Sequence, residues 1–169
     1  LKEIGNIILV VGKTEGHLDQ SIFAREILNE KKGPPPEINL FNEKNNGETI
    51  LRLIKDKLLR SVHDVSLGGI ITGIAKMCIK GKKGLNFYKF KGVIDKFEYF
   101  FSEDQGRYII EVKKEHLEKV KKLLEKNSNH YDLIGEVIED NISINDEPTL
   151  SVDKLSEFNK DWLIKYMIN

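Results

Sequence analysis

Short apolar runs alternate along the chain with longer stretches in which apolar residues recur every three or four positions. The short runs are typical of β-strands and lie at residues 6–11, 61–65, 85–90, 107–112, 131–138 and 141–144. The longer stretches carry apolar residues on one face and predict helices over residues 21–28, 48–59, 68–79, 114–126 and 151–167. The pattern as a whole predicts a mixed α and β domain.

Composition narrows the class of protein. The chain has 169 residues, of which 40% are hydrophobic, so residues 1–169 are expected to form a single domain with a substantial core. Its 27 basic and 27 acidic side chains cancel, which removes the strongest electrostatic reason to expect a nucleic-acid or membrane partner. One cysteine, Cys78, allows no internal disulfide, and no apolar run is long enough to span a bilayer. We therefore expect a cytoplasmic location, and the absence of a starting methionine suggests a piece of a longer polypeptide.

A predicted strand that runs directly into a predicted helix carries the sharpest local signal, with a serine, a histidine and an aspartate close together. Alternate side chains of an extended strand face opposite ways. Ser61 and His63 therefore share one face of this strand, while Asp64 and Ser66 share the other. This spacing argues against a Ser, His, Asp triad made from these neighbours.

The same segment places Asp64 at the carboxyl end of the strand, above a helix that opens with Gly68 and Gly69. Free N–H groups and the positive end of a helix dipole favour phosphate, and a carboxylate there could hold Mg²⁺. The alternative is that Asp64 and Ser66 only cap the helix. Both interpretations agree with the sequence.

A second polar cluster, from Ser102 to Arg107, lies immediately before a predicted strand. Its acids Glu103 and Asp104, together with Gln105, offer oxygen ligands for a metal ion. The Arg107 guanidinium could bind phosphate through two hydrogen bonds. An ordinary charged turn explains the same residues, and taken alone the cluster favours the turn.

Other features of the sequence have simpler explanations. Residues 12–14 imitate the end of a phosphate-binding loop but lack the glycine five positions earlier. The lysines and aromatic residues between Lys80 and Lys96 could bind single-stranded nucleic acid, although strand alternation accounts for most of the aromatic residues as core. Cys78 lies on the apolar stripe of its helix with no base beside it, so we expect a packed thiol rather than a nucleophile.

Several segments, taken in order, resemble one family. They lie at residues 11–21, 34–39 with 46–47, 62–69, 101–108 and 133–137, followed by the closing helix after Leu150. Together they resemble the carboxyl-terminal domain of phosphoribosylformylglycinamidine synthase, in the superfamily of aminoimidazole ribonucleotide synthetase. The resemblance spans nearly the whole chain, and the order and spacing of the segments are more specific than any one of them.

The resemblance implies an α+β fold, with a mixed β-sheet packed with helices as in the carboxyl-terminal domain of aminoimidazole ribonucleotide synthetase. It implies a parent enzyme that uses ATP and Mg²⁺ to convert formylglycinamide ribonucleotide and glutamine-derived ammonia to formylglycinamidine ribonucleotide in purine biosynthesis. The implied partners are the remaining domains of the synthase, a glutaminase subunit and a small accessory subunit. The family's catalytic histidine and ATP-binding lysine lie in the first part of the polypeptide, so no catalytic residue is implied in this chain.

The opening and closing segments look like the second, final copy of this domain in the synthase. Matched with the first copy, Asp64 is similar to a Mg²⁺ ligand, and residues 103–105 match a stretch that contacts substrate. The chain departs from the family's usual pattern at three positions, where a glycine, an acidic residue and a serine are replaced by Asp19, Leu67 and Asp104.

Two hypotheses follow from these observations. In the first, the chain is a structural carboxyl-terminal domain that is inactive alone. In the second, it carries a phosphate or nucleotide site, with Asp64 as metal ligand and with Ser66, Gly68, Gly69, Glu103, Gln105 and Arg107 as binding residues. A domain of another ATP-dependent superfamily member, such as aminoimidazole ribonucleotide synthetase or selenophosphate synthetase, is a further alternative, against which the opening segment argues.

Overall fold

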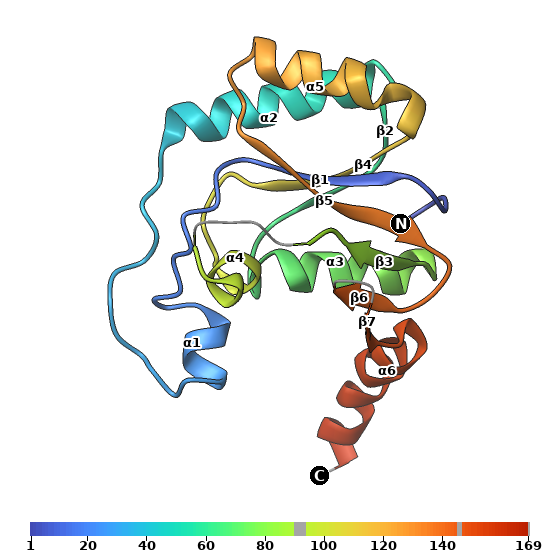
Figure 1. Cartoon of the computed structure of the whole chain (residues 1–169). Coiled ribbons are helices and arrows are strands. Elements are labelled where there is room, and N and C mark those ends of the chain that lie inside the picture. Colours follow the sequence, from blue (N-terminus) through green and yellow to red (C-terminus); the bar gives the residue numbers. More distant parts are fainter. Residues whose placement is uncertain (90–93, 145–146, 169) are drawn as a thin grey trace.

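A mixed β-sheet forms the centre of the computed structural model, which describes residues 1–89, 94–144 and 147–168 (Figure 1). Within these residues the sheet has seven strands in the order β2-β4-β1-β5-β3-β6-β7. The strands are β1 (Ile7–Val11), β2 (Leu59–Asp64), β3 (Gly84–Phe87), β4 (Tyr108–Val112), β5 (Tyr131–Ile138), β6 (Ile142–Ile144) and β7 (Glu147–Leu150). Neighbouring strands are antiparallel except β3 and β6, which are parallel. The expected α+β fold with a mixed sheet is confirmed.

Helices cover both faces of this sheet (Figure 1). On one face lie α2 (Leu40–Lys55) and α5 (Leu117–Lys126), the latter preceded by a 3-10 turn, η1 (Lys114–His116). On the other face lie α3 (Gly69–Gly81), α4 (Lys96–Phe101) and α6 (Val152–Ile168), with the short α1 (Ile22–Glu26) next to α4. Among the described residues no helix is long and apolar enough to cross a membrane.

Strand β1 separates two apolar cores, one on each face of the sheet. All five of its residues are buried. Ile7, Leu9 and Val11 point into the core under α2 and α5, whereas Ile8 and Val10 point into the core under α3. Because alternate side chains enter different cores, both sets are apolar and the strand reads as a continuous apolar run.

Helix α2 is longer than the sequence indicates. It begins at Leu40 rather than at residue 48, and it ends at Lys55. The Asn39 side chain caps it by accepting a hydrogen bond from the Asn42 N–H (3.0 Å). The residues that α2 buries begin only at Asn46, so its first turns carry no apolar stripe for a periodicity argument to detect.

Two short elements of the structure were missed by the sequence pattern. Helix α4 opens with a capping box, in which the Asp95 carboxylate accepts from Phe97 N–H (2.7 Å) and Glu98 accepts from Asp95 N–H (3.3 Å). Strand β7 contains Pro148, which lacks an N–H and is tolerated because β7 is the edge of the sheet. The predicted strand over 85–90 ends at Phe87, and residue 90 lies outside the described residues.

The position of α2 is tested by two leucines of that helix. Leu53 is fully buried and Leu51 is 57% exposed. Leu53→Ala is expected to lower the free energy of unfolding by about 2–5 kcal/mol because it leaves a cavity in the core. Leu51→Ala, the matched control, is expected to change it by no more than about 0.5 kcal/mol. Urea denaturation measures both values, and equal losses would contradict this placement of the helix.

Candidate functional site

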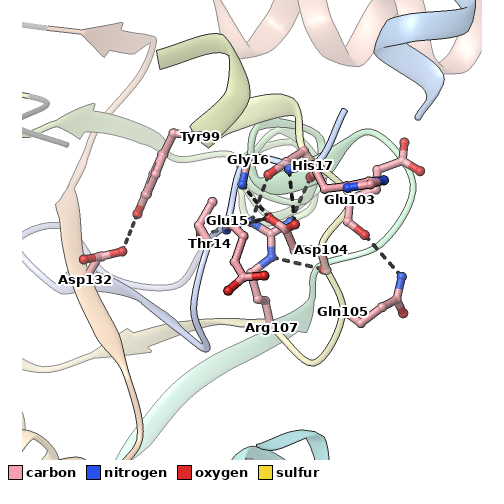
Figure 2. Close-up of polar contacts among 11 residues, drawn as sticks. Thr14, Glu15, Gly16, His17, Tyr99, Glu103, Asp104, Gln105, Arg107 and Asp132 are labelled. Carbon is pink, nitrogen blue, oxygen red and sulfur yellow. Dashed lines mark hydrogen bonds and ion pairs between the residues drawn. The ribbon is translucent and has the colours of Figure 1, made fainter. Parts of the chain in front are cut away.

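The polar turn over residues 102–107 lies at one end of the sheet, where three segments of the chain meet (Figure 2). The loop over residues 14–17 contacts it, and so does the backbone that precedes α3. The side chains of Glu103, Asp104 and Arg107 bond to these neighbours. The start of α3, from the first polar cluster of the sequence, therefore meets the second cluster in space at Gly68.

Asp104 and Arg107 form the buried centre of this turn. The Asp104 carboxylate accepts hydrogen bonds from three successive backbone N–H groups. These groups belong to Glu15 (3.0 Å), Gly16 (3.1 Å) and His17 (3.2 Å). Arg107 Nη1 lies 3.7 Å from Asp104 Oδ2, and the two side chains are 0% and 8% exposed. Neither charge reaches water to any extent, so each depends on the other for compensation.

The remaining donors of Arg107 bond to uncharged oxygens. Nη2 donates to the Ser102 carbonyl (2.8 Å), Nε to the Asp104 carbonyl (3.1 Å), and Nη1 to the Thr14 hydroxyl (3.0 Å). Burial lowers the pKa of Arg107 from its usual value, and the Asp104 charge acts in the opposite direction. With no exposed surface, this guanidinium links parts of the chain to one another.

Glu103 ties two helices to the same turn. One oxygen of its carboxylate accepts the N–H of Gly68 (2.8 Å) and the N–H of Ile22 (2.9 Å). These groups precede α3 and open α1, and such N–H groups have no partner inside their own helix. In this structure the anion at the Gly68 N–H is thus a side chain of the chain itself, at the position where the sequence suggested phosphate.

The other predicted binding residues are not gathered into one site. Gln105 is exposed and lines a groove described below. Ser66 is also exposed, and its carbonyl accepts the N–H of Gly69 (3.0 Å). A Cβ atom at Gly69 would lie 2.6 Å from the carbonyl oxygens of Phe100 and Ser102, so close packing against α4 accounts for this glycine.

Asp64 is paired with Tyr108 at the end of β2, next to the turn, but its side chain is 73% exposed and faces a different groove. With His63 and Tyr108 it lines a separate groove beside α2 whose other lining residues are glycine and aliphatic side chains. Over the part of the chain that the structure describes, no group of three or more His, Cys, Asp and Glu side chains is arranged to hold a metal ion. Asp64 therefore offers Mg²⁺ a single carboxylate, and its role as a metal ligand stays a prediction.

A larger groove of about 780 Å³ opens beside the buried turn. Six acidic residues line it: Glu15, Asp19, Glu37, Glu43, Glu98 and Asp104. The one lysine of its lining, Lys13, places its amino group 2.6 Å from Glu15. The negative charge around this groove opposes the binding of a polyphosphate by this chain alone.

Sequence reasoning missed the partners of Asp104 in the opening loop. These partners are backbone N–H groups, which every residue other than proline has and which no residue type reveals. The available signal is Gly16, whose φ of +84° is a conformation that favours glycine and turns the neighbouring N–H groups toward one point.

The chain matches the family described as "AIR synthase related protein, C-terminal domain" over residues 3–146, and it belongs to this family. Over its whole length it is 62% identical to the phosphoribosylformylglycinamidine synthase subunit PurL of Pelagibacter ubique. It is 37% identical over 98% of its length to PurL of Bartonella bacilliformis. The resemblance to this synthase is thus confirmed, and the chain spans 23% and 22% of the two relatives.

Solved structures of Thermotoga maritima PurL share the fold. The complex with FGAR has a TM-score of 0.73 at 18% identity, covering 92% of this chain and 28% of that chain. The complex with ATP has a TM-score of 0.67 at 17% identity, with coverages of 92% and 26%. The PurLQS structure has a TM-score of 0.68 at 19% identity, with coverages of 92% and 27%. At these identities the likeness supports the fold alone.

The role of Glu103 in joining α1 and α3 is tested by truncation. Glu103→Ala leaves the N–H groups of Gly68 and Ile22 without an acceptor, so the free energy of unfolding is expected to fall by about 1–3 kcal/mol. Glu103→Gln keeps an oxygen at this position and is expected to lose less. Gln105→Ala, an exposed neighbour, is the matched control in urea denaturation. A Glu103→Ala loss no larger than that of the control would refute the linking role.

Cys78 is expected to be unreactive in the folded chain. It is fully buried on α3, and burial raises the pKa of its thiol to about 12. At mildly alkaline pH the native protein is expected to react with iodoacetamide far more slowly than the protein in concentrated urea. Mass spectrometry of the alkylated chain over time measures this ratio. Similar rates in the two states would contradict the packing of α3 against the sheet.

Proposed function

We propose that this chain is the carboxyl-terminal domain of a phosphoribosylformylglycinamidine synthase and that it supports an active site built by other parts of the polypeptide. The observation that carries the proposal is the 62% identity along the whole chain to a PurL subunit of which it spans 23%. The parent enzyme would use ATP to convert formylglycinamide ribonucleotide and ammonia to formylglycinamidine ribonucleotide. The same identity favours this synthase over aminoimidazole ribonucleotide synthetase and selenophosphate synthetase.

Exposed apolar side chains support a role that depends on neighbouring domains. On α2, Leu40 and Phe41 are exposed, and on α6 so are Phe158, Trp162 and Tyr166. The spacing of four residues aligns these three aromatic side chains along one side of α6, whose carboxyl end projects from the body of the domain (Figure 1). Apolar surface of this kind is typical of interaction sites, and we assign it to contacts with the remaining domains of the synthase.

The internal bonding of the polar turn supports a domain without its own reaction. Asp104 and Arg107 are buried together, and the carboxylate of Glu103 is bound to backbone N–H groups. Thermotoga maritima PurL has been solved with ATP and with FGAR. We propose that the parent of this chain binds ATP and Mg²⁺ through residues outside it, since Asp64 alone does not complete a metal site among the described residues.

Partners of the parent enzyme are proposed on the same basis. Thermotoga maritima PurL has been solved in a PurLQS assembly. We propose that the parent of this chain likewise associates with a glutaminase subunit and a small accessory subunit in the cytoplasm. The balance of 27 basic and 27 acidic side chains supports the expectation of no nucleic-acid or membrane partner.

The proposed function is tested with a chimaera. In PurL of Pelagibacter ubique the segment that matches this chain is replaced by the chain itself, which is 62% identical. ATP hydrolysis with formylglycinamide ribonucleotide and ammonia is expected to be restored to within about tenfold of the natural enzyme, a loss of at most about 1.4 kcal/mol in transition-state stabilisation. The isolated chain is expected to give no turnover, because it lacks the catalytic part of the polypeptide.

Two controls accompany this assay. PurL truncated before the replaced segment is expected to be inactive, so full activity of the truncated enzyme would contradict the supporting role. Calorimetric titration of the isolated chain with Mg²⁺ and ADP is expected to give no binding heat. Turnover by the isolated chain, or binding heat that Gln105→Ala abolishes, would favour the second hypothesis of a site within this chain.

A further inference from the structure

A second feature of the buried turn does not depend on which enzyme the chain belongs to. The N–H groups of Glu15, Gly16 and His17 converge on one carboxylate at distances of 3.0–3.2 Å (Figure 2). Successive N–H groups that point to a common centre form a concave nest that binds anions through backbone dipoles. Nothing in this arrangement requires that the anion be covalently attached to the chain.

The charge balance also calls for an anion at this point. Asp104 is the one carboxylate within 4 Å of the Arg107 guanidinium among the described residues, and the other Arg107 partners are neutral oxygens. Three donor N–H groups and one buried cation therefore share a single negative charge. If that charge is removed, the nest and the guanidinium lose their common partner.

The nest is accessible from outside the chain. Glu15, Gly16, His17 and Asp104 all line the 780 Å³ groove described above. An anion in the groove would thus reach the N–H groups directly if the Asp104 side chain were absent. The many carboxylates that line the groove oppose a highly charged ligand, whereas a small, singly charged oxyanion adds the least repulsion.

We propose that the backbone of residues 15–17 and the Arg107 guanidinium form a binding site for a small oxyanion, and that Asp104 fills this site from within the chain. The site takes a carboxylate of the size of acetate, which is the group that an aspartate side chain presents. While Asp104 occupies it, the three N–H groups are already bonded and are not available to an anion in the groove. The side chain thereby closes a ligand position and links two segments at once.

The proposal is tested by removing the side chain and supplying its carboxylate from solution. Asp104→Gly leaves a gap of the size of acetate, and Asp104→Ala leaves one of the size of formate. Sodium acetate is compared with sodium chloride at equal ionic strength by thermal and urea denaturation. In Asp104→Gly, acetate at ten times its dissociation constant is expected to raise the ratio of folded to unfolded chains about tenfold. The unsubstituted protein, whose site is filled, is expected to respond equally to the two salts.

Two further measurements separate specific binding from a general salt effect. Asp104→Asn, which keeps the volume of the side chain, is expected to show no acetate-specific stabilisation. The amide resonances of Glu15, Gly16 and His17 in Asp104→Gly are expected to shift with acetate at the concentration that gives half of the stabilisation.

Equal responses of Asp104→Gly, Asp104→Asn and the unsubstituted protein to acetate would overturn the proposal. Stabilisation without movement of the three amide resonances would also overturn it. If Asp104→Gly is unfolded in both salts, Asp104→Ala is compared in sodium formate and sodium chloride instead. Stabilisation by formate would support the site, and equal stability in the two salts would overturn it. A chain that folds only in the carboxylate salt would support the site.

Discussion

A buried carboxylate and a buried guanidinium organise the polar end of this domain. Asp104 fixes the opening loop through three backbone N–H groups, and Arg107 binds the oxygens of Thr14 and Ser102. Since neither side chain is solvated, the two charges compensate each other and neither is stable in this position alone. The loop before α1, the turn after α4 and the start of β4 consequently behave as one unit.

The sheet determines where this unit lies. The last residue of β1, Val11, is paired with Tyr108 at the start of β4, and Tyr108 is paired in turn with Asp64 at the end of β2. The segments that adjoin these strand ends therefore lie together at the same end of the sheet. At Gly12 the backbone passes so close to the turn that a Cβ atom would lie 2.7 Å from the Gly106 carbonyl oxygen. This contact explains the glycine that made residues 12–14 resemble a phosphate-binding loop.

The sequence predicted the parts of the fold that have a strong apolar pattern. Strand β1 and helix α3 bury continuous or wide apolar faces, and the structure confirms both. The first turns of α2 were missed because they bury almost nothing. Strand β7 was missed because it is short and contains Pro148, a residue that is unusual in strands. A periodic pattern of apolar residues arises from burial of one face, so it does not reveal elements that bury little surface.

The residue types of the polar turn were recognised in the sequence, but the partners that their side chains contact were not. Glu103 and Arg107 were singled out as candidate ligand-binding groups, a role that stays a prediction. In the structure Glu103 accepts from backbone N–H groups of two distant segments, and Arg107 donates to the carbonyl of nearby Ser102. A buried side chain and one that faces a ligand have the same letters in a sequence. Only the tertiary structure distinguishes these two kinds of side chain, because it determines which N–H groups and carbonyls lie beside each charge.

We propose that the polar groups of this domain bind one another and that none of them binds a nucleotide. Native-state hydrogen exchange at the amides of Glu15, Gly16, His17, Ile22 and Gly68 tests it most directly, in the presence and absence of Mg²⁺ and ATP. The account predicts that all five amides are protected and that nucleotide leaves their exchange rates unchanged. Rapid exchange that slows when nucleotide is added would contradict it.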